Sequence, residues 1–166
     1  NKIGSLRVAW AAADVFSFFN KRYNCIHAMS LYSKFSHVMV IKDREPSEDD
    51  YIKFFRDAAD RGILEANIIL DNAFRQTRLI YELTSLGCIP HFAPPESHWS
   101  NGACERRHRT IRAIVEKICA VKGYERFVMI IAAAVRSCNN TPTRTLHGLS
   151  PYQVHYGRES TIKIIK

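Results

Sequence analysis

The middle of the chain alternates between helical and strand patterns, and this alternation limits its fold more than any other feature. After Ser47, a good N-cap residue, apolar side chains recur at helical spacing over residues 48–61. The apolar run 66–70 is too short for a helix and predicts a buried strand. A helical pattern over 75–86 and a strand pattern over 88–92 follow. Strands that alternate with helices in this way are typical of parallel pairing in an α/β sheet.

The segments on either side of this alternation complete the predicted architecture. Strand patterns cover residues 6–19, 23–31 and 35–41. Their short connections favour an antiparallel meander. After a loop at 93–102, helices are predicted to about residue 121, over 125–138 and over 151–157. We therefore expect an α/β fold with a five-stranded mixed sheet, built from the antiparallel meander plus parallel strands, with helices on both faces.

Size and composition are those of an ordinary globular domain. The chain has 166 residues, 46% of them hydrophobic, which is enough for one sizeable core. No apolar run reaches the roughly 20 residues that span a bilayer. We expect a single domain over residues 1–166, cut from a longer protein because the chain begins with Asn1 and not with Met.

The five cysteines are odd in number, widely spaced and never arranged as Cys-x-x-Cys. This usage favours reduced thiols and an intracellular location. A weaker alternative is a zinc site formed by Cys88, His91, His98 and Cys104, because these residue types are zinc ligands. Ordinary strand, loop and helix positions explain the same residues more simply, and we prefer that interpretation.

The positive charge is concentrated in the second part of the chain. The formal net charge is +8, yet residues 1–72 have ten basic and ten acidic side chains, whereas residues 73–166 have fourteen basic and six acidic ones. A one-sided basic surface is expected for a polyanion partner such as DNA. A solvated charged face with no partner explains the charge equally well.

Three acidic residues, far apart in the sequence, stand where a sheet would bring them together. Asp71 follows the buried strand 66–70, Glu105 lies in the first turns of a basic helix, and Asp14 lies in the middle of the first strand pattern. Ligands of open α/β sheets gather beyond the carboxyl ends of the strands. A carboxylate within a strand needs a partner or a metal ion. An edge or bulge position for Asp14 is the alternative.

Three such carboxylates suit Mg²⁺ or Mn²⁺, which prefer oxygen ligands. Two ions roughly 3.5–4 Å apart can hold the attacking and the leaving oxygen of an in-line displacement at phosphorus. We therefore take Asp14, Asp71 and Glu105 as the candidate catalytic and metal-binding residues of a phosphodiester chemistry. No small-molecule cofactor is expected.

The predicted basic helix sorts its residues by face. Glu105, His108, Arg109 and Arg112 follow an i, i+3, i+4, i+7 pattern on a stripe that differs from the apolar one. An acid beside basic residues can place a metal ion next to a DNA phosphate. The alternative is a simple surface ion pair between Glu105 and Arg109.

Several motifs occur along the chain in a recognisable order. They are Ile69-Leu70-Asp71-Asn72, Gly87-Cys88-Ile89-Pro90-His91, Ser100-Asn101-Gly102-Ala103-Cys104-Glu105-Arg106, Asn140-Thr141-Pro142-Thr143 and Ser150-Pro151-Tyr152-Gln153-Val154-His155-Tyr156-Gly157-Arg158. Together they resemble the catalytic core of retroviral and long-terminal-repeat retrotransposon integrases, from Val8 to about Glu159. Several separate matches in the right order make the resemblance specific.

The resemblance implies a ribonuclease-H-like fold and a DDE triad of Asp14, Asp71 and Glu105. It implies a two-metal polynucleotidyl transferase that trims the 3′ ends of element DNA and joins them to host DNA. It also implies a homodimer or higher oligomer that acts in the nucleus. Four residues match positions that approach DNA ends in relatives: Asn101, His108, Arg109 and Arg112.

Two departures from the family pattern keep other functions open. Ala73 stands where the family usually has Gly, so a different local turn is expected, because Gly adopts positive φ cheaply and Ala does not. Ser30 stands where many relatives have an acid. One alternative is therefore an inactive, host-adopted module that binds DNA or protein. Another is a different DDE transposase or nuclease on the same fold.

Overall fold

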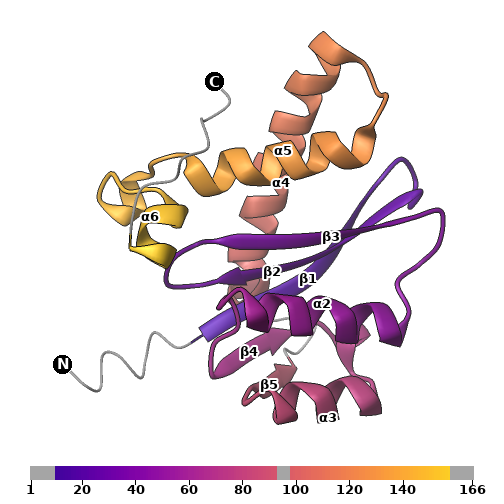
Figure 1. The fold of residues 1–166 in the computed structure, drawn as a ribbon, viewed down its shortest axis with the longest axis vertical. Helices are drawn as coiled ribbons and strands as arrows, with labels where there is room; N and C mark the ends of the chain where they lie inside the picture. The colour runs from indigo at the N-terminus through magenta and orange to yellow at the C-terminus, as the bar shows by residue number, and fades with distance from the viewer. Residues whose placement is uncertain (1–9, 93–97, 158–166) are drawn as a thin grey trace.

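The computed structural model describes residues 10–92 and 98–157. In these ranges the chain forms five strands, five α-helices and two short 3₁₀ helices (Figure 1). The strands are β1 (Trp10–Phe18), β2 (Tyr23–Ser30), β3 (Ser36–Lys42), β4 (Asn67–Leu70) and β5 (Ile89–Phe92). The helices are α2 (Glu48–Asp60), α3 (Thr77–Ser85), α4 (His98–Lys122), α5 (Phe127–Asn140) and α6 (Pro151–Tyr156), with 3₁₀ helices η1 (Asn72–Phe74) and η2 (Arg144–Leu146). The predicted order of strands and α-helices is confirmed.

The five strands form one mixed sheet in the order β3-β2-β1-β4-β5. β2 pairs antiparallel with both β1 and β3, whereas β4 pairs parallel with β1 and β5 parallel with β4. The meander and its two parallel additions are thus confirmed. β1 is the central strand, which explains its run of buried alanines, since both of its faces are covered.

Helices cover both faces of the sheet, as predicted. α2 and α3 pack on one face, and α4 and α5 pack on the other (Figure 1). The core under α2 and α3, here the α2/α3 core, includes the fully buried rings of Phe54, Phe55 and Phe74. The core on the opposite face, here the α4/α5 core, joins Phe16 of β1 to Ile111 of α4 and to the apolar side of α5.

The alternation of side chains along β1 assigns its residues to the two faces. Ala13 belongs to the α2/α3 core, whereas Phe16 belongs to the α4/α5 core. Ala12 packs with Cys104 of α4. Asp14 has the same parity as Ala12 and Phe16, so its side chain lies on the α4 side of the sheet.

Capping explains why α2 and α6 begin where the sequence predicts. The Ser47 hydroxyl accepts a hydrogen bond from the Asp50 N–H, and the Asp50 carboxylate accepts one from the Ser47 N–H. Ser150 and Gln153 form the same reciprocal pair at the start of α6. Each pair satisfies two backbone donors that the first turn of a helix leaves unpaired.

The prediction of a loop that continues to residue 102 was wrong over its last part, because α4 already begins at His98. Gly102 lies within this helix without a positive φ, although Gly costs about 1 kcal/mol relative to Ala in a helix. A Cβ atom at Gly102 would lie 3.3 Å from Nη1 of Arg106, so the missing side chain leaves room for that guanidinium. Residues 6–9 of the first predicted strand lie outside the described ranges.

The turn after β4 requires no glycine. Asp71 precedes η1 with extended backbone, and Ala73 within η1 has no positive φ. Ala73 therefore occupies this turn without backbone strain. No described helix is long and apolar enough to cross a membrane.

Candidate active site

Asp14 and Asp71 are brought together by strand register. In the parallel pair of β1 and β4, Ala13 lies opposite Leu70. Asp14 follows Ala13 and Asp71 follows Leu70, so the two acids lie next to each other where β4 ends. Asp14 is half-buried in the central strand, and its Oδ1 accepts a 2.7 Å hydrogen bond from the N–H of Val15. Asp71 is exposed, because β4 ends at Leu70 and η1 turns the chain away.

Glu105 comes to the same region from α4. The residue before it, Cys104, is buried against Ala12 of β1 and Ile69 of β4. This contact holds the first turns of α4 over the carboxyl end of β4 and leaves the Glu105 side chain exposed.

The pKa of Asp14 is affected by both of the other acids. The pKa of the Asp14 carboxyl is raised to about 6. Burial is the largest cause, the Val15 N–H acts against it, and the negative charges of Asp71 and Glu105 add to the increase. Like charges disfavour ionisation only when they are close enough to interact. Asp71 and Glu105 thus both lie within electrostatic range of Asp14, whose side chain is on the α4 side of the sheet.

The three carboxylates are close enough for Asp71 and Glu105 to affect the pKa of Asp14, but they are not arranged as the ligands of one metal ion. Among the described residues, no three side chains of His, Cys, Asp or Glu are arranged so that they could hold a metal ion. The donor set itself fits a hard cation, because it consists of carboxylate oxygens. A cation between the carboxylates would also relieve the repulsion that raises the pKa of Asp14.

The predicted stripe of α4 divides into a buried part and an exposed part. His108 is buried, and its Nε2 shares a 3.0 Å hydrogen bond with Nδ1 of His27 in β2. Its ring stacks on Phe16, with 4.1 Å between the ring centroids. Arg112 is half-buried and donates a 2.7 Å hydrogen bond from Nη2 to the carbonyl oxygen of Ser17. Both side chains therefore tie α4 to the sheet.

The other two residues with a predicted DNA contact differ from this pair. Arg109 is exposed on α4, and no described carboxylate pairs with it. Asn101 belongs to the first turns of α4, but its side chain lies outside the part of the structure that is described. Arg109 is consequently the residue of the stripe that is free to meet a phosphate.

His27 is the residue of this region that the sequence reasoning missed. Its Nε2 shares a 2.9 Å hydrogen bond with the Ser36 hydroxyl of β3, so a buried chain runs from Ser36 through His27 to His108. Burial, and next the neighbouring His108, lower the pKa of His27, and burial lowers that of His108 to about 4. A partial signal existed: the predicted turn at 20–22 places His27 within one residue of the position opposite Asp14, which it occupies in the structure.

The alternative zinc site does not form from its described members. Cys88 is buried in the α2/α3 core, whereas Cys104 is buried on the α4 side of the sheet. His91 shares a 3.0 Å hydrogen bond with Asn67, and its ring lies tilted against that of Trp10, with 4.7 Å between the centroids. The side chain of His98 lies outside the described part. All five cysteines are free, as the sequence indicated, and the structure shows that they are also buried.

Comparison with known proteins finds sequence similarity over part of the chain. The chain is 36% identical over 58 residues to the Pol polyprotein of Radiation murine leukemia virus (strain Kaplan). This match covers 35% of the chain and 10% of the polyprotein. No protein-family model matches the chain.

Solved structures match nearly the whole chain. A chain of the simian T-cell lymphotropic virus intasome, solved in complex with PP2A regulatory subunit B56 gamma, matches with a TM-score of 0.79 and 18% identity, over 96% of this chain and 58% of that one. The catalytic core domain of BIV integrase matches with a TM-score of 0.74 and 18% identity, over 90% and 95%. The HTLV-2 integrase catalytic core domain, solved with magnesium as a dimer, matches with a TM-score of 0.72 and 19% identity, over 89% and 96%. The chain therefore has the ribonuclease-H-like fold of a retroviral integrase catalytic core domain, and the resemblance drawn from its motifs is confirmed at this level.

Proposed function

We propose that this chain is the catalytic core of a metal-dependent polynucleotidyl transferase, an integrase that processes the 3′ ends of element DNA and joins them to host DNA. The observation that carries the proposal is the electrostatic coupling of Asp14 to Asp71 and Glu105. These acids come from the central strand, the end of its parallel neighbour and the helix above them. The match to integrase cores supports the same reaction.

Asp14, Asp71 and Glu105 are the residues that would hold Mg²⁺ or Mn²⁺ in this proposal. When bound, two such ions activate the attacking oxygen and stabilise the leaving oxygen of a phosphodiester. The buried links made by His108 and Arg112 hold α4, and with it Glu105, against the sheet. The HTLV-2 core, which shares the fold, was solved in complex with magnesium.

DNA is the partner that the charge of this region favours. Arg109 is exposed one turn after Glu105, where a cation can contact a phosphate beside the acids. Asn101 lies on the same helix, one turn before Glu105, and is proposed to approach the DNA end. Related folds occur in an intasome and as a dimer, so we propose that this protein also acts as an oligomer, in the nucleus.

Substitution Glu105→Gln tests the reaction. It keeps the size of the side chain but removes a charged ligand, so we expect strand transfer with Mn²⁺ to fall by at least about 100-fold. The assay is joining of a labelled element-end duplex to target DNA by the full-length protein. Glu116→Gln is the matched control, because Glu116 is an exposed residue of the same helix. Strand transfer by Glu105→Gln at the wild-type rate would refute the proposed role.

A catalytically inactive module that binds DNA or protein is the second candidate. The observation in its favour is that the described acids are not arranged as ligands of a metal ion. Calorimetric titration with Mn²⁺ separates the two functions. Heat of binding that disappears in Asp14→Asn and Asp71→Asn supports the enzyme, and no binding by the wild-type protein supports the inactive module.

A further inference from the structure

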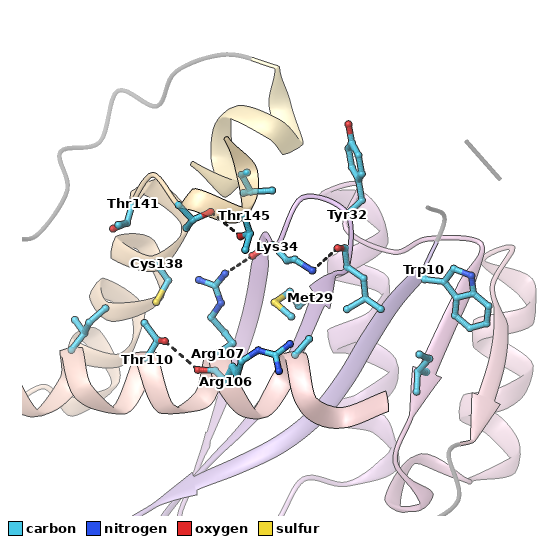
Figure 2. A pocket seen from close by; sticks show the side chains of 16 residues that line it. Trp10, Met29, Tyr32, Lys34, Arg106, Arg107, Thr110, Cys138, Thr141 and Thr145 are labelled. Carbon is cyan, nitrogen blue, oxygen red and sulfur yellow. Dashed lines mark hydrogen bonds between the residues drawn. The ribbon is translucent and has the colours of Figure 1, made fainter. Parts of the chain in front are cut away.

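A second site lies on the other side of α4 from the acids. An open cavity has a volume of about 910 Å³. Most of its lining comes from three parts of the chain: the end of β2 with the turn after it, the first half of α4, and the connection from α5 to α6 (Figure 2). None of Asp14, Asp71 and Glu105 lines it. Its volume falls in the range of about 300–1,000 Å³ that is usual for small-molecule sites.

Three cations line this cavity, and no described carboxylate does. Lys34 comes from the turn after β2, and Arg106 and Arg107 come from α4 (Figure 2). Nζ of Lys34 donates a 2.8 Å hydrogen bond to the carbonyl oxygen of Leu31, and Nη2 of Arg107 donates a 2.9 Å hydrogen bond to the carbonyl oxygen of Lys34. These bonds hold Lys34 and Arg107 in place and leave further donors of both side chains free.

The positive charges of Lys34, Arg106 and Arg107 are not balanced by an acidic side chain within the described ranges. None of the three side chains forms an ion pair there with Asp or Glu. The pKa of Lys34 is lowered, first by its burial and then by the positive charges of Arg106 and Arg107. Cations held together without an acid are destabilising unless an anion is bound between them.

The rest of the lining indicates what kind of anion fits. Four threonines also line the cavity, but their hydroxyl protons are largely engaged. Thr110 and Thr141 donate to the carbonyl oxygens of Arg106 and Ser137, and Thr143 and Thr145 share one hydrogen bond, so the cations are the main donors for an anion. Met29, Leu31 and Leu146 form an apolar wall. Two aromatic residues, Trp10 and Tyr32, lie at the edge of the cavity, and Tyr32 is 56% exposed (Figure 2).

This combination matches a phosphate with an apolar, planar body better than it matches a carboxylate. A phosphate monoester presents three terminal oxygens, enough for two guanidinium groups and an ammonium group at once, whereas a carboxylate presents two. An apolar wall with aromatic rings at its edge can accept a base by packing and stacking.

We propose that this cavity binds a nucleotide, with its phosphate held by Lys34, Arg106 and Arg107 and its base against the apolar wall. The nucleotide is either free or the 5′-phosphorylated terminal nucleotide of a DNA strand. The site goes beyond the proposed transferase chemistry, because it uses none of the three acids and needs no metal ion.

Calorimetry in the presence of EDTA tests the proposal. The probes are deoxyadenosine 5′-monophosphate, deoxyadenosine and inorganic phosphate. We expect the monophosphate to bind, and Lys34→Gln or Arg106→Gln to weaken it at least about tenfold, since each removes a charge-assisted hydrogen bond. Lys53→Gln is the matched control, because Lys53 is an exposed lysine of α2 on the opposite face of the sheet.

The outcomes separate the alternatives. No binding of the monophosphate, or equal weakening by Lys53→Gln, overturns the site. Inorganic phosphate that binds as tightly as the nucleotide overturns the base-binding part. A short single strand that binds more tightly with a 5′-phosphate than with a 5′-hydroxyl, and more tightly than the free nucleotide, supports DNA as the source; preference for the free nucleotide supports the other source.

Two further measurements keep the test interpretable. Arg106→Gln serves if Lys34→Gln fails to fold, because the exposed Arg106 guanidinium makes no hydrogen bond within the described ranges that folding would need. Glu105→Gln should bind the nucleotide within about twofold of wild type, since a single exposed charge contributes little. If strand transfer is lost and nucleotide binding is retained, the substitution affects the active site and not this cavity. If nucleotide binding is lost and strand transfer is retained, it affects this cavity and not the active site.

Discussion

Aromatic rings pack together in both cores of the protein, but the α4/α5 core also surrounds a buried chain of hydrogen-bonded polar side chains. On the first face, Phe54 and Phe55 pack edge to face with 5.1 Å between their centroids. On the second, Phe16 packs edge to face with Phe18 and also stacks on the imidazole of His108, which is hydrogen-bonded to His27. The first face is built for burial of apolar area, and the second carries the candidate acids and the polar contacts that hold α4 above them.

This difference teaches how one sheet can serve both stability and chemistry. Apolar burial is non-directional and tolerates small shifts in position. Hydrogen bonds between buried polar groups hold only at defined distances and angles. The buried bonds under α4 fix the helix that carries Glu105.

The largest effect is expected in the α2/α3 core. Phe54→Ala removes a fully buried ring and should lower the free energy of unfolding by about 3–5 kcal/mol. Urea unfolding followed by circular dichroism measures it. Tyr81→Ala is the control, because Tyr81 of α3 is 74% exposed. A loss below about 1 kcal/mol for Phe54→Ala would contradict the division between the two faces.

The next effect concerns Asn139, which joins α5 to β3. Its Oδ1 accepts a hydrogen bond from the Ser36 N–H, and its Nδ2 donates one to the Ser36 carbonyl oxygen, both at 2.9 Å. Asn139→Ala leaves two buried backbone groups unpaired and should cost about 2–3 kcal/mol in urea unfolding.

The neighbouring residue is the matched control for this change. Asn140 is also buried, but its Oδ1 has no hydrogen-bond partner among the described residues, and its Nδ2 bonds only within α5, to the carbonyl oxygen of Arg136. Asn140→Ala should therefore cost less than Asn139→Ala. Equal losses would show that the bridge from α5 to β3 contributes nothing specific.

A third effect depends on pH and tests the histidine pair. The pKa of His108 falls from 6.5 to about 4 on folding, because the ring is buried and Arg112 is near, with His27 and Phe16 facing it from the sheet. Below about pH 6.5 the unfolded chain binds a proton that the folded chain does not bind until about pH 4. Stability is thus fully present above this window and is lost as the pH falls through it.

Comparison with a non-titrating variant isolates that contribution. Between pH 7 and pH 5 in metal-free buffer, wild type should lose roughly 1–2 kcal/mol more stability than His108→Gln. His147→Asn is the control, because His147 is exposed and has positive φ, which Asn tolerates. Parallel pH curves for wild type and His108→Gln would mean that the ring already ionises normally in the folded protein.

The smallest effect lies at the start of α2. Ser47→Ala removes the hydroxyl half of the capping box and should cost about 1 kcal/mol. Thermal unfolding by calorimetry measures it, and Ser47→Asp, which restores an N-cap acceptor, should recover most of the loss. The change should leave DNA joining unaffected, since α2 lies on the face without the acids. If a folded Ser47→Ala protein joined DNA more slowly than wild type, the conclusion that the α2 face does not contribute to DNA joining would be wrong.

Much of the fold could be predicted because its signals are local. The alternation of strand and helix over 66–92, and the capping residues Ser47 and Ser150, each act within a few positions of the chain. The pairing of Asp14 with the end of β4 also followed from one topological rule, that parallel strands align their carboxyl ends.

The boundary of α4 and the roles of its basic residues could not be predicted in the same way. Glycine often ends a helix, but Gly102 lies inside α4. Cys104, two residues later, packs against β1 and β4 and holds this part of α4 on the sheet. His108 and Arg109 are adjacent in sequence and equally polar, and only the approach of β2 buries one and leaves the other exposed.

By itself, the sequence determined the order of the elements, the mixed sheet and the three acids that its strands and helix would carry towards one edge. The tertiary structure alone decided that His27 would bond His108 beneath those acids, and that Lys34, Arg106 and Arg107 would line one cavity. The physical reason is range. Periodicity and capping act over a few residues, whereas these contacts join side chains from strands and helices that meet only after the sheet has formed.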